Sequence, residues 1–159
     1  MLRYVAMGTL AAVLAIGGCP GGQGLQIPIE AGTYSGTLEC TAILPDGTTS
    51  TSSFDTTVVM SQDGVLNVYD NDMIVGETYV IESGESRVEQ TIEDIVLDGG
   101  LIEIQITGSA ETPLGDTTFA QSVLLEQPDA SRLLLDDLFI SQEADGEFRE
   151  NCVGTLTVE

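Results

Sequence analysis

Apolar and polar residues alternate along most of the chain from Ala31 to the C-terminus. In the clearest example, Ile102, Ile104 and Ile106 share one face of the expected strand, and the residues between them are polar. Successive side chains of a β-strand point to opposite faces, so a period of two predicts a strand with one buried face. The pattern therefore predicts a β protein.

Nine strand-like runs follow one another along the chain. In run 88–97 the alternation of apolar and polar residues is mixed. The leucine-rich run at 133–140 could instead form two helical turns, because leucine has a high helix propensity. We favour a strand there. The nine strands are expected near residues 34–44, 53–60, 65–69, 77–82, 88–97, 102–107, 117–126, 132–141 and 151–158.

Short turns rich in Asp, Gly and Pro separate these runs, for example at 45–47, 62–64 and 98–100. Many short strands joined by such turns predict an all-β, antiparallel fold. The expected architecture is an up-and-down barrel of about eight or nine strands, with a β-sandwich as the alternative.

The first and last runs are complementary. If they pair antiparallel with Cys40 opposite Cys152, each glycine faces a leucine, as Gly36 faces Leu156, and both cysteines lie on the apolar side. Pairing the first strand with the last closes a meander into a barrel, which removes exposed sheet edges. This complementarity is the main argument for a barrel.

The N-terminus has a different pattern. Residues 1–3 carry one positive charge, residues 4–16 are almost entirely apolar, and Ile16-Gly17-Gly18-Cys19 follows. This is the layout of a secretory signal peptide, and it resembles the lipobox of bacterial lipoproteins. The resemblance implies cleavage before Cys19, a diacylglyceryl thioether on its sulfur, and acylation of the new N-terminus by a fatty acid such as palmitate.

The alternatives are a transmembrane helix or an ordinary secreted protein. The apolar run is about 13 residues, short of the ~20 that a helix needs to cross a bilayer core. The expected division is a lipoprotein signal peptide at 1–18, the lipidated cysteine with a flexible Gly-rich tether at 19–29, and an acidic β-domain at 30–159. The expected location is the cell envelope, with the domain lipid-anchored to a membrane.

Export bears on the two remaining cysteines. Disulfides form in oxidising compartments, so Cys40 and Cys152 are expected to form one, which closes a loop of 111 intervening residues. Such a bridge contributes roughly 4 kcal/mol in the chain-entropy model. Two buried free thiols are the alternative.

Gly32-Thr33-Tyr34 resembles the Gly-x-Trp start of the first strand in lipocalin-like barrels, with tyrosine in place of tryptophan. The resemblance implies a barrel and carries no ligand assignment.

Charge narrows the range of partners. After removal of the leader, 3 arginines stand against 26 acidic residues, with no lysine or histidine. Nucleic acid is excluded as a partner, because binding it requires basic residues to displace counterions. Anionic headgroups would repel the domain. Divalent cations, basic proteins and cationic small molecules remain, and adaptation to a saline medium is the alternative reason for the acidity.

Composition also argues against catalysis. Without histidine or lysine the chain lacks the usual general bases for nucleophilic catalysis. Carboxylate pairs remain as an option, but neighbours such as Asp136 and Asp137 point to opposite faces of a strand and do not form a catalytic pair. We expect no enzymatic activity and no cofactor. Arg132 is expected to pair with a neighbouring acid such as Asp136.

Calcium is the one metal that the residue types allow, since it takes oxygen ligands. Asp70, Asn71 and Asp72 are weak candidates, joined by Asp63, although the same residue types are also common in tight turns. Two functions remain. The domain binds a small apolar or amphipathic ligand, or it is a structural or interaction module of the envelope with a packed core.

Overall fold

The computed structural model describes residues 12–14, 29–62, 66–68, 71–98, 100–113 and 115–159. Strands make up all the regular structure within these ranges. None of the described residues belongs to a helix that is long and apolar enough to cross a membrane.

Seven of the strands contain 12 or more residues, which is long for a domain of this size, and the described residues form eleven strands in all. They are β1 (Ala12–Leu14), β2 (Gly32–Ile43), β3 (Thr49–Met60), β4 (Leu66–Val68), β5 (Asn71–Asp72), β6 (Thr78–Ser83), β7 (Ser86–Asp98), β8 (Leu101–Thr112), β9 (Gly115–Asp129), β10 (Arg132–Glu143) and β11 (Gly146–Val158). The leucine-rich run at 133–140 is a strand, so the helical alternative is wrong.

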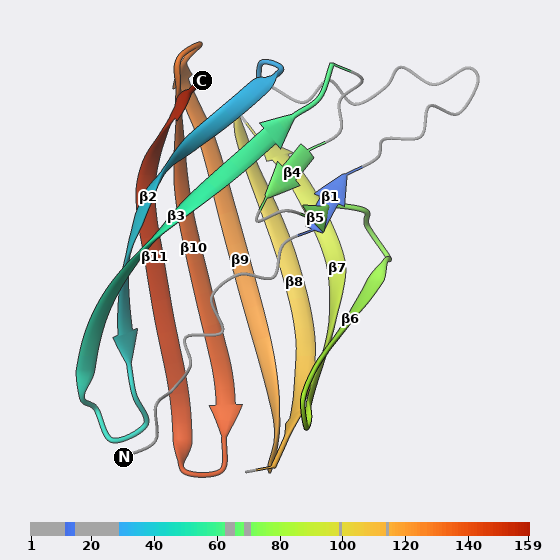
Figure 1. Cartoon of the computed structure of the whole chain (residues 1–159), viewed down its shortest axis with the longest axis vertical. Helices are drawn as coiled ribbons and strands as arrows, with labels where there is room; N and C mark the ends of the chain where they lie inside the picture. Colours follow the sequence, from blue (N-terminus) through green and yellow to red (C-terminus); the bar gives the residue numbers. More distant parts are fainter. Residues whose placement is uncertain (1–11, 15–28, 63–65, 69–70, 99, 114) are drawn as a thin grey trace.

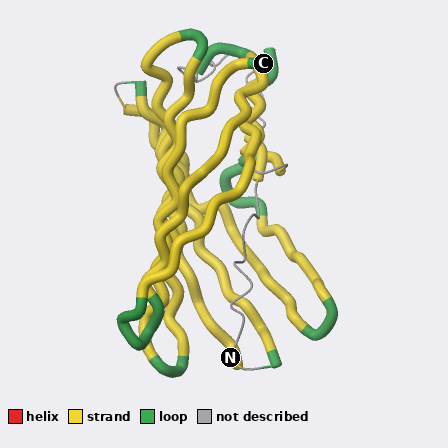
Figure 2. The backbone as a smooth tube through the Cα atoms, turned by 60° about the vertical axis from the view of Figure 1, so that its left-hand side comes forward, coloured by secondary structure: helices red, strands yellow, loops and turns green. Residues whose placement is uncertain are grey.

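All the described strands form one sheet in the order β1-β5-β4-β3-β2-β11-β10-β9-β8-β7-β6. Every ladder is antiparallel except the one between β1 and β5. The sheet curls into a half-barrel (Figures 1 and 2). The all-β, barrel-like class is therefore confirmed, and a single continuous sheet excludes the sandwich.

The half-barrel is open between the edge formed by β1 and β5 and the opposite edge strand, β6. The strands beside this opening are short: three residues in β4 and two in β5. Such strands offer few backbone groups for a ladder, and no ladder joins β6 to them within the described residues. One side-chain contact spans the opening, where the Tyr79 hydroxyl donates to the Asp72 carbonyl oxygen at 2.8 Å.

The first and last long strands pair as the sequence predicts. Cys40 lies opposite Cys152 and is bonded to it, which confirms the disulfide. The glycines of these strands make room for leucines. A Cβ on Gly154 would lie 2.6 Å from Leu38 Cδ2, and one on Gly36 would lie 3.0 Å from Leu156 Cδ2. Close packing between β2 and β11 therefore depends on glycine at both positions.

The core lies on the inner face of the curled sheet, and it is mostly aliphatic toward the strand ends opposite the β8–β9 and β10–β11 turns, which are the upper ends in Figure 1. In one row of register partners, Ile102, Leu125 and Leu135 lie side by side on β8, β9 and β10, and all are almost completely buried. The mixed alternation of β7 has a local cause. A register shift between Ile92 and Asp94 displaces Glu93, after which Ile95 and Leu97 face inward again.

Candidate functional site

The lower part of the inner face has a different composition. The lower end is the end where the β2–β3, β8–β9 and β10–β11 turns lie in Figure 1. Two rows of register partners approach it: Gln121, Phe139 and Glu150 in one, and Phe119, Ser141 and Phe148 in the next. Asp137 lies in the row above, opposite Cys152. We call Phe119, Phe139, Phe148, Gln121, Asp137 and Glu150 the aromatic–acid cluster.

Three phenylalanines from three adjacent strands form the apolar part of this cluster. The rings of Phe119 and Phe139 stack with centroids 5.1 Å apart, and Phe148 meets Phe139 edge-on at 6.2 Å. Offset stacks and edge contacts are the arrangements that aromatic quadrupoles favour. Phe119 is buried, whereas Phe139 and Phe148 are partly exposed. Two of the rings therefore remain accessible.

Gly108 positions the innermost ring. It lies opposite Phe119 on β8, and a Cβ at this position would be 2.3 Å from Phe119 Cζ and 2.3 Å from the backbone oxygen of Glu89. Only glycine leaves space for the ring to lie against the strand. Beside it on β7, Gln90 is 2% exposed, and its Nε2 has no hydrogen-bond partner within the described part of the chain.

A buried carboxylate lies above the rings. Asp137 is 7% exposed, and the Gln121 amide donates to both of its oxygens, at 2.9 Å to Oδ1 and 2.8 Å to Oδ2. A carboxylate removed from water costs free energy unless it is hydrogen-bonded or paired with a positive charge. Gln121 supplies two such hydrogen bonds to the carboxyl of Asp137.

Glu150 adds a second inward carboxyl, because it shares the inward parity of Phe148 and Cys152 on β11. Burial raises the pKa of Glu150 above its ordinary value. A raised pKa means that the ionised form lacks the solvation it has in water. A positive group bound beside Glu150 would supply part of that missing stabilisation.

The positive charges of the β-domain lie on the other face. Arg87, Arg132 and Arg149 occupy outward positions of their strands, and all three side chains reach solvent. Arg132 pairs with a neighbouring acid as expected, but this acid is Asp129 and not Asp136, at 2.6 Å between Nη2 and Oδ2. This hydrogen-bonded pair lowers the pKa of Asp129 to about 2. Asp129 is the last residue of β9 and lies opposite Arg132 in the β9–β10 ladder, whereas Asp136 lies four residues further along β10.

The other predicted sites have different outcomes. Cys19 and Asp70 lie outside the described residues, as does Asp63. Asn71 and Asp72 form β5, and Asp72 is exposed. The described ranges contain no group of three or more carboxylate, thiol or imidazole side chains placed to hold a metal ion. The calcium hypothesis therefore gains no support from them, and the absence of enzymatic activity stays a prediction.

Sequence reasoning did not find the aromatic–acid cluster. It did place Asp136 and Asp137 on opposite faces, and they are exposed and buried, respectively. The inward parity of Leu133 and Leu135 was the signal that assigns Asp137 to the interior. The meeting of the three phenylalanines depends on the pairing of β9, β10 and β11, which alternation within one strand does not specify.

Comparison with known proteins gives no family assignment. No protein-family model, no curated protein and no solved structure matches this chain.

Proposed function

We propose that this chain is an exported, lipid-anchored protein of the cell envelope whose half-barrel binds a small cationic amphiphile on its inner face. The observation that carries the binding proposal is the aromatic–acid cluster, in which accessible rings lie beside two inward carboxyls. A positive group near such rings gains cation–π attraction, and the carboxylates supply its counter-charge. The apolar part of the ligand would lie along the phenylalanines.

The anchor proposal rests on the lipobox-like sequence before Cys19 and is supported by the disulfide, which is typical of exported proteins. Cleavage before Cys19 would remove β1 together with the leader. The sheet edge would then be formed by β4 and β5, beside the opening between β5 and β6. Maturation would thus leave this side of the half-barrel less covered.

Membrane fractionation tests the anchor. We expect Cys19→Ser to release the protein from membranes, because the thioether is the only attachment proposed. The unaltered chain should carry the mass of the acyl groups. Retention of the Cys19→Ser chain in the membrane fraction would refute the anchor while leaving the binding proposal intact.

Titration with decyltrimethylammonium below its micelle concentration tests binding. The matched variants are Asp137→Asn and Asp136→Asn, which remove one charge each from adjacent residues on opposite faces. We expect about tenfold weaker binding for Asp137→Asn, equivalent to about 1.4 kcal/mol, and little change for Asp136→Asn. Thermal melting of both variants checks that the fold is retained.

Decyl sulfate and decyl maltoside serve as ligand controls, since they keep the alkyl chain and change the head group. Preferred binding of the cation, with NMR shifts at the three phenylalanine rings, is the expected result. Equal binding of all three amphiphiles would contradict the role of the carboxyls. If none of them binds, a packed interaction module becomes the better description of the inner face.

A further inference from the structure

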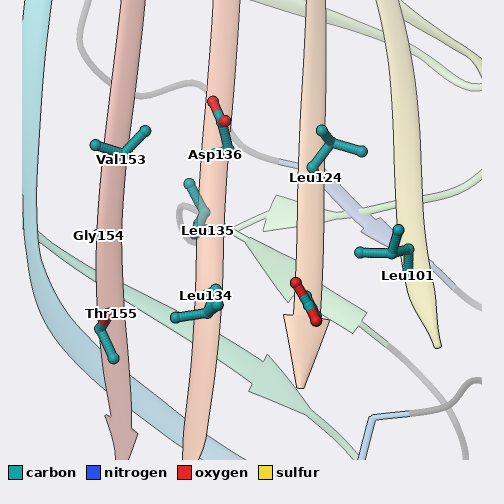
Figure 3. A pocket seen from close by; sticks show the side chains of 9 residues that line it. Leu101, Leu124, Leu134, Leu135, Asp136, Val153, Gly154 and Thr155 are labelled. Carbon is teal, nitrogen blue, oxygen red and sulfur yellow. The ribbon is translucent and has the colours of Figure 1, made fainter. Parts of the chain in front are cut away.

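A second apolar surface lies on the outer face of the sheet, away from the aromatic–acid cluster. It is a shallow hollow of about 450 Å³ across β8, β9, β10 and β11, lined by apolar side chains and carboxylates (Figure 3). Leu101, Leu134 and Val153 are exposed, at 40%, 36% and 45% of their surface. We call Leu101, Leu124, Leu134 and Val153, with Glu126 and Asp136, the outer zigzag.

Strand register gives this surface a regular pattern. Val153 lies opposite Asp136, which lies opposite Leu124. Two residues along each strand, Leu134 lies opposite Glu126, which lies opposite Leu101. The apolar residue therefore lies in one row on one strand and in the other row on the next strand. On β9 and β10, a carboxylate occupies the row in which the strand has no apolar residue.

The spacing of the zigzag fits a helix that crosses the strands. Neighbouring strands are about 4.8 Å apart, so an apolar side chain recurs at roughly that interval across the sheet. An α-helix rises 5.4 Å per turn and presents apolar residues once per turn along one face. The two rows lie roughly 7 Å apart along the strands, within the 10–12 Å width of a helix.

Charge determines which helix fits. Glu126 and Asp136 lie between the apolar residues of the outer zigzag. Glu103 places a further carboxylate on β8, opposite Leu124. Arg132, two residues before Leu134, is already bound to Asp129. An acidic or neutral helix would leave these carboxylates partly desolvated without a positive charge beside them, whereas Lys or Arg beside the apolar stripe would pair with them.

We propose that the outer zigzag docks a basic amphipathic helix of a partner protein, with the helix axis running across β8 to β11. This function is separate from ligand binding on the inner face, and neither depends on the other. The helix places its apolar stripe against the leucines and Val153, and its basic residues on Glu126 and Asp136.

The probe for this proposal is an 18-residue peptide of leucine and lysine in helical order, titrated into the exported chain carrying Cys19→Ser so that no detergent is needed. A peptide of the same composition with leucine and lysine strictly alternating, and one with glutamate for lysine, are the peptide controls. We expect the helical peptide to bind at least tenfold more tightly than either control. The backbone amides of the protein whose NMR chemical shifts change on binding should belong to β8–β11.

Variants separate docking from general attraction to an acidic protein. Leu134→Thr with Val153→Thr leaves the charge unchanged and should weaken binding at least tenfold. The matched control pair, Val75→Thr with Val80→Thr, alters exposed valines elsewhere and should change binding less than twofold. Asp136→Asn with Glu126→Gln should weaken binding about fivefold, and Glu111→Gln with Asp116→Asn, of equal charge, should not.

Equal losses in the test and control pairs would overturn the proposal, because they indicate attraction to net charge alone. Shifts that map away from β8–β11 would overturn it as well. Two other occupants have distinct signatures: vesicles of phosphatidylcholine that compete with the peptide indicate a lipid surface, and dimerisation abolished by Leu134→Thr with Val153→Thr indicates a second copy. Either result would replace the helix.

Discussion

The upper and lower parts of the inner face are built from the same strands and serve different purposes. The upper rows contain aliphatic side chains that are almost completely buried, such as Leu125, Leu135 and Ile102. The lower rows contain partly exposed rings and inward carboxyls, such as Phe139 and Glu150. Burial of the upper rows stabilises the half-barrel, and this stability is what allows the lower rows to hold polar groups in the interior.

The disulfide lies at the boundary between these two regions, in the row of Asp137. Replacing Cys40 and Cys152 by serine together is expected to lower the free energy of unfolding by about 4 kcal/mol, because it frees a long loop in the unfolded chain. Urea denaturation measures the change. A loss below about 1 kcal/mol would mean that the β2–β11 pairing holds the two ends of the chain without the bond.

A truncation in the upper rows tests their structural role. Leu125→Ala removes a completely buried side chain and should cost about 3 kcal/mol, since large-to-small core substitutions lose burial and leave a cavity. Binding of decyltrimethylammonium per folded molecule should stay unchanged. Phe148→Leu in the lower rows is the counterpart and should cost less stability but weaken binding. If Leu125→Ala impairs binding more than Phe148→Leu, the division between the two regions is wrong.

Gly108→Ala is expected to affect both properties. The added methyl would overlap Phe119 and the backbone of β7, and such overpacking costs typically 1–3 kcal/mol. Displacement of the ring should also weaken amphiphile binding. Ser109→Ala, one residue on and facing outward, is the control. Near-UV circular dichroism follows the displacement of the ring, and titration follows amphiphile binding. If Gly108→Ala behaves like Ser109→Ala in both measurements, the Phe119 ring has space to move.

The sequence predicted the upper region better than the lower one. Alternation of period two placed Ile102, Ile104 and Ile106 inward and predicted nine strands that the structure contains. It did not predict β1 or β5, whose few residues are in strands because they pair with each other and with β4. The opening next to β5 was missed for the same reason, since sheet closure depends on distant backbone groups.

The register between two strands was predictable only where particular residue pairs determine it. The cysteines and the glycine–leucine contacts specify how β2 meets β11, and that pairing is confirmed. No comparable signal exists between β9, β10 and β11, where several registers keep apolar residues inward. The aromatic–acid cluster arises from the register that forms, so it required the structure.

The smallest expected effect concerns Glu150, and its sign follows from burial. Because the folded state raises the pKa of Glu150, the folded chain binds its proton more tightly than the unfolded chain does. Stability from this group is therefore fully present below the unfolded pKa, and it is lost as the pH rises through the folded pKa. Glu150→Gln removes this loss, so the variant should become more stable than the unaltered protein as the pH rises through that window.

Denaturation of both proteins as a function of pH measures this difference, with Glu147→Gln, an exposed acid on the same strand, as control. A bound cation should act in the opposite direction, because it stabilises ionised Glu150 directly. Affinity for decyltrimethylammonium should therefore increase with pH through the same window, and Glu150→Gln should reduce this increase. If Glu150→Gln leaves the pH dependence of affinity unchanged, Glu150 does not contact the positive group, and the charge recognition in the lower region falls to Asp137 alone.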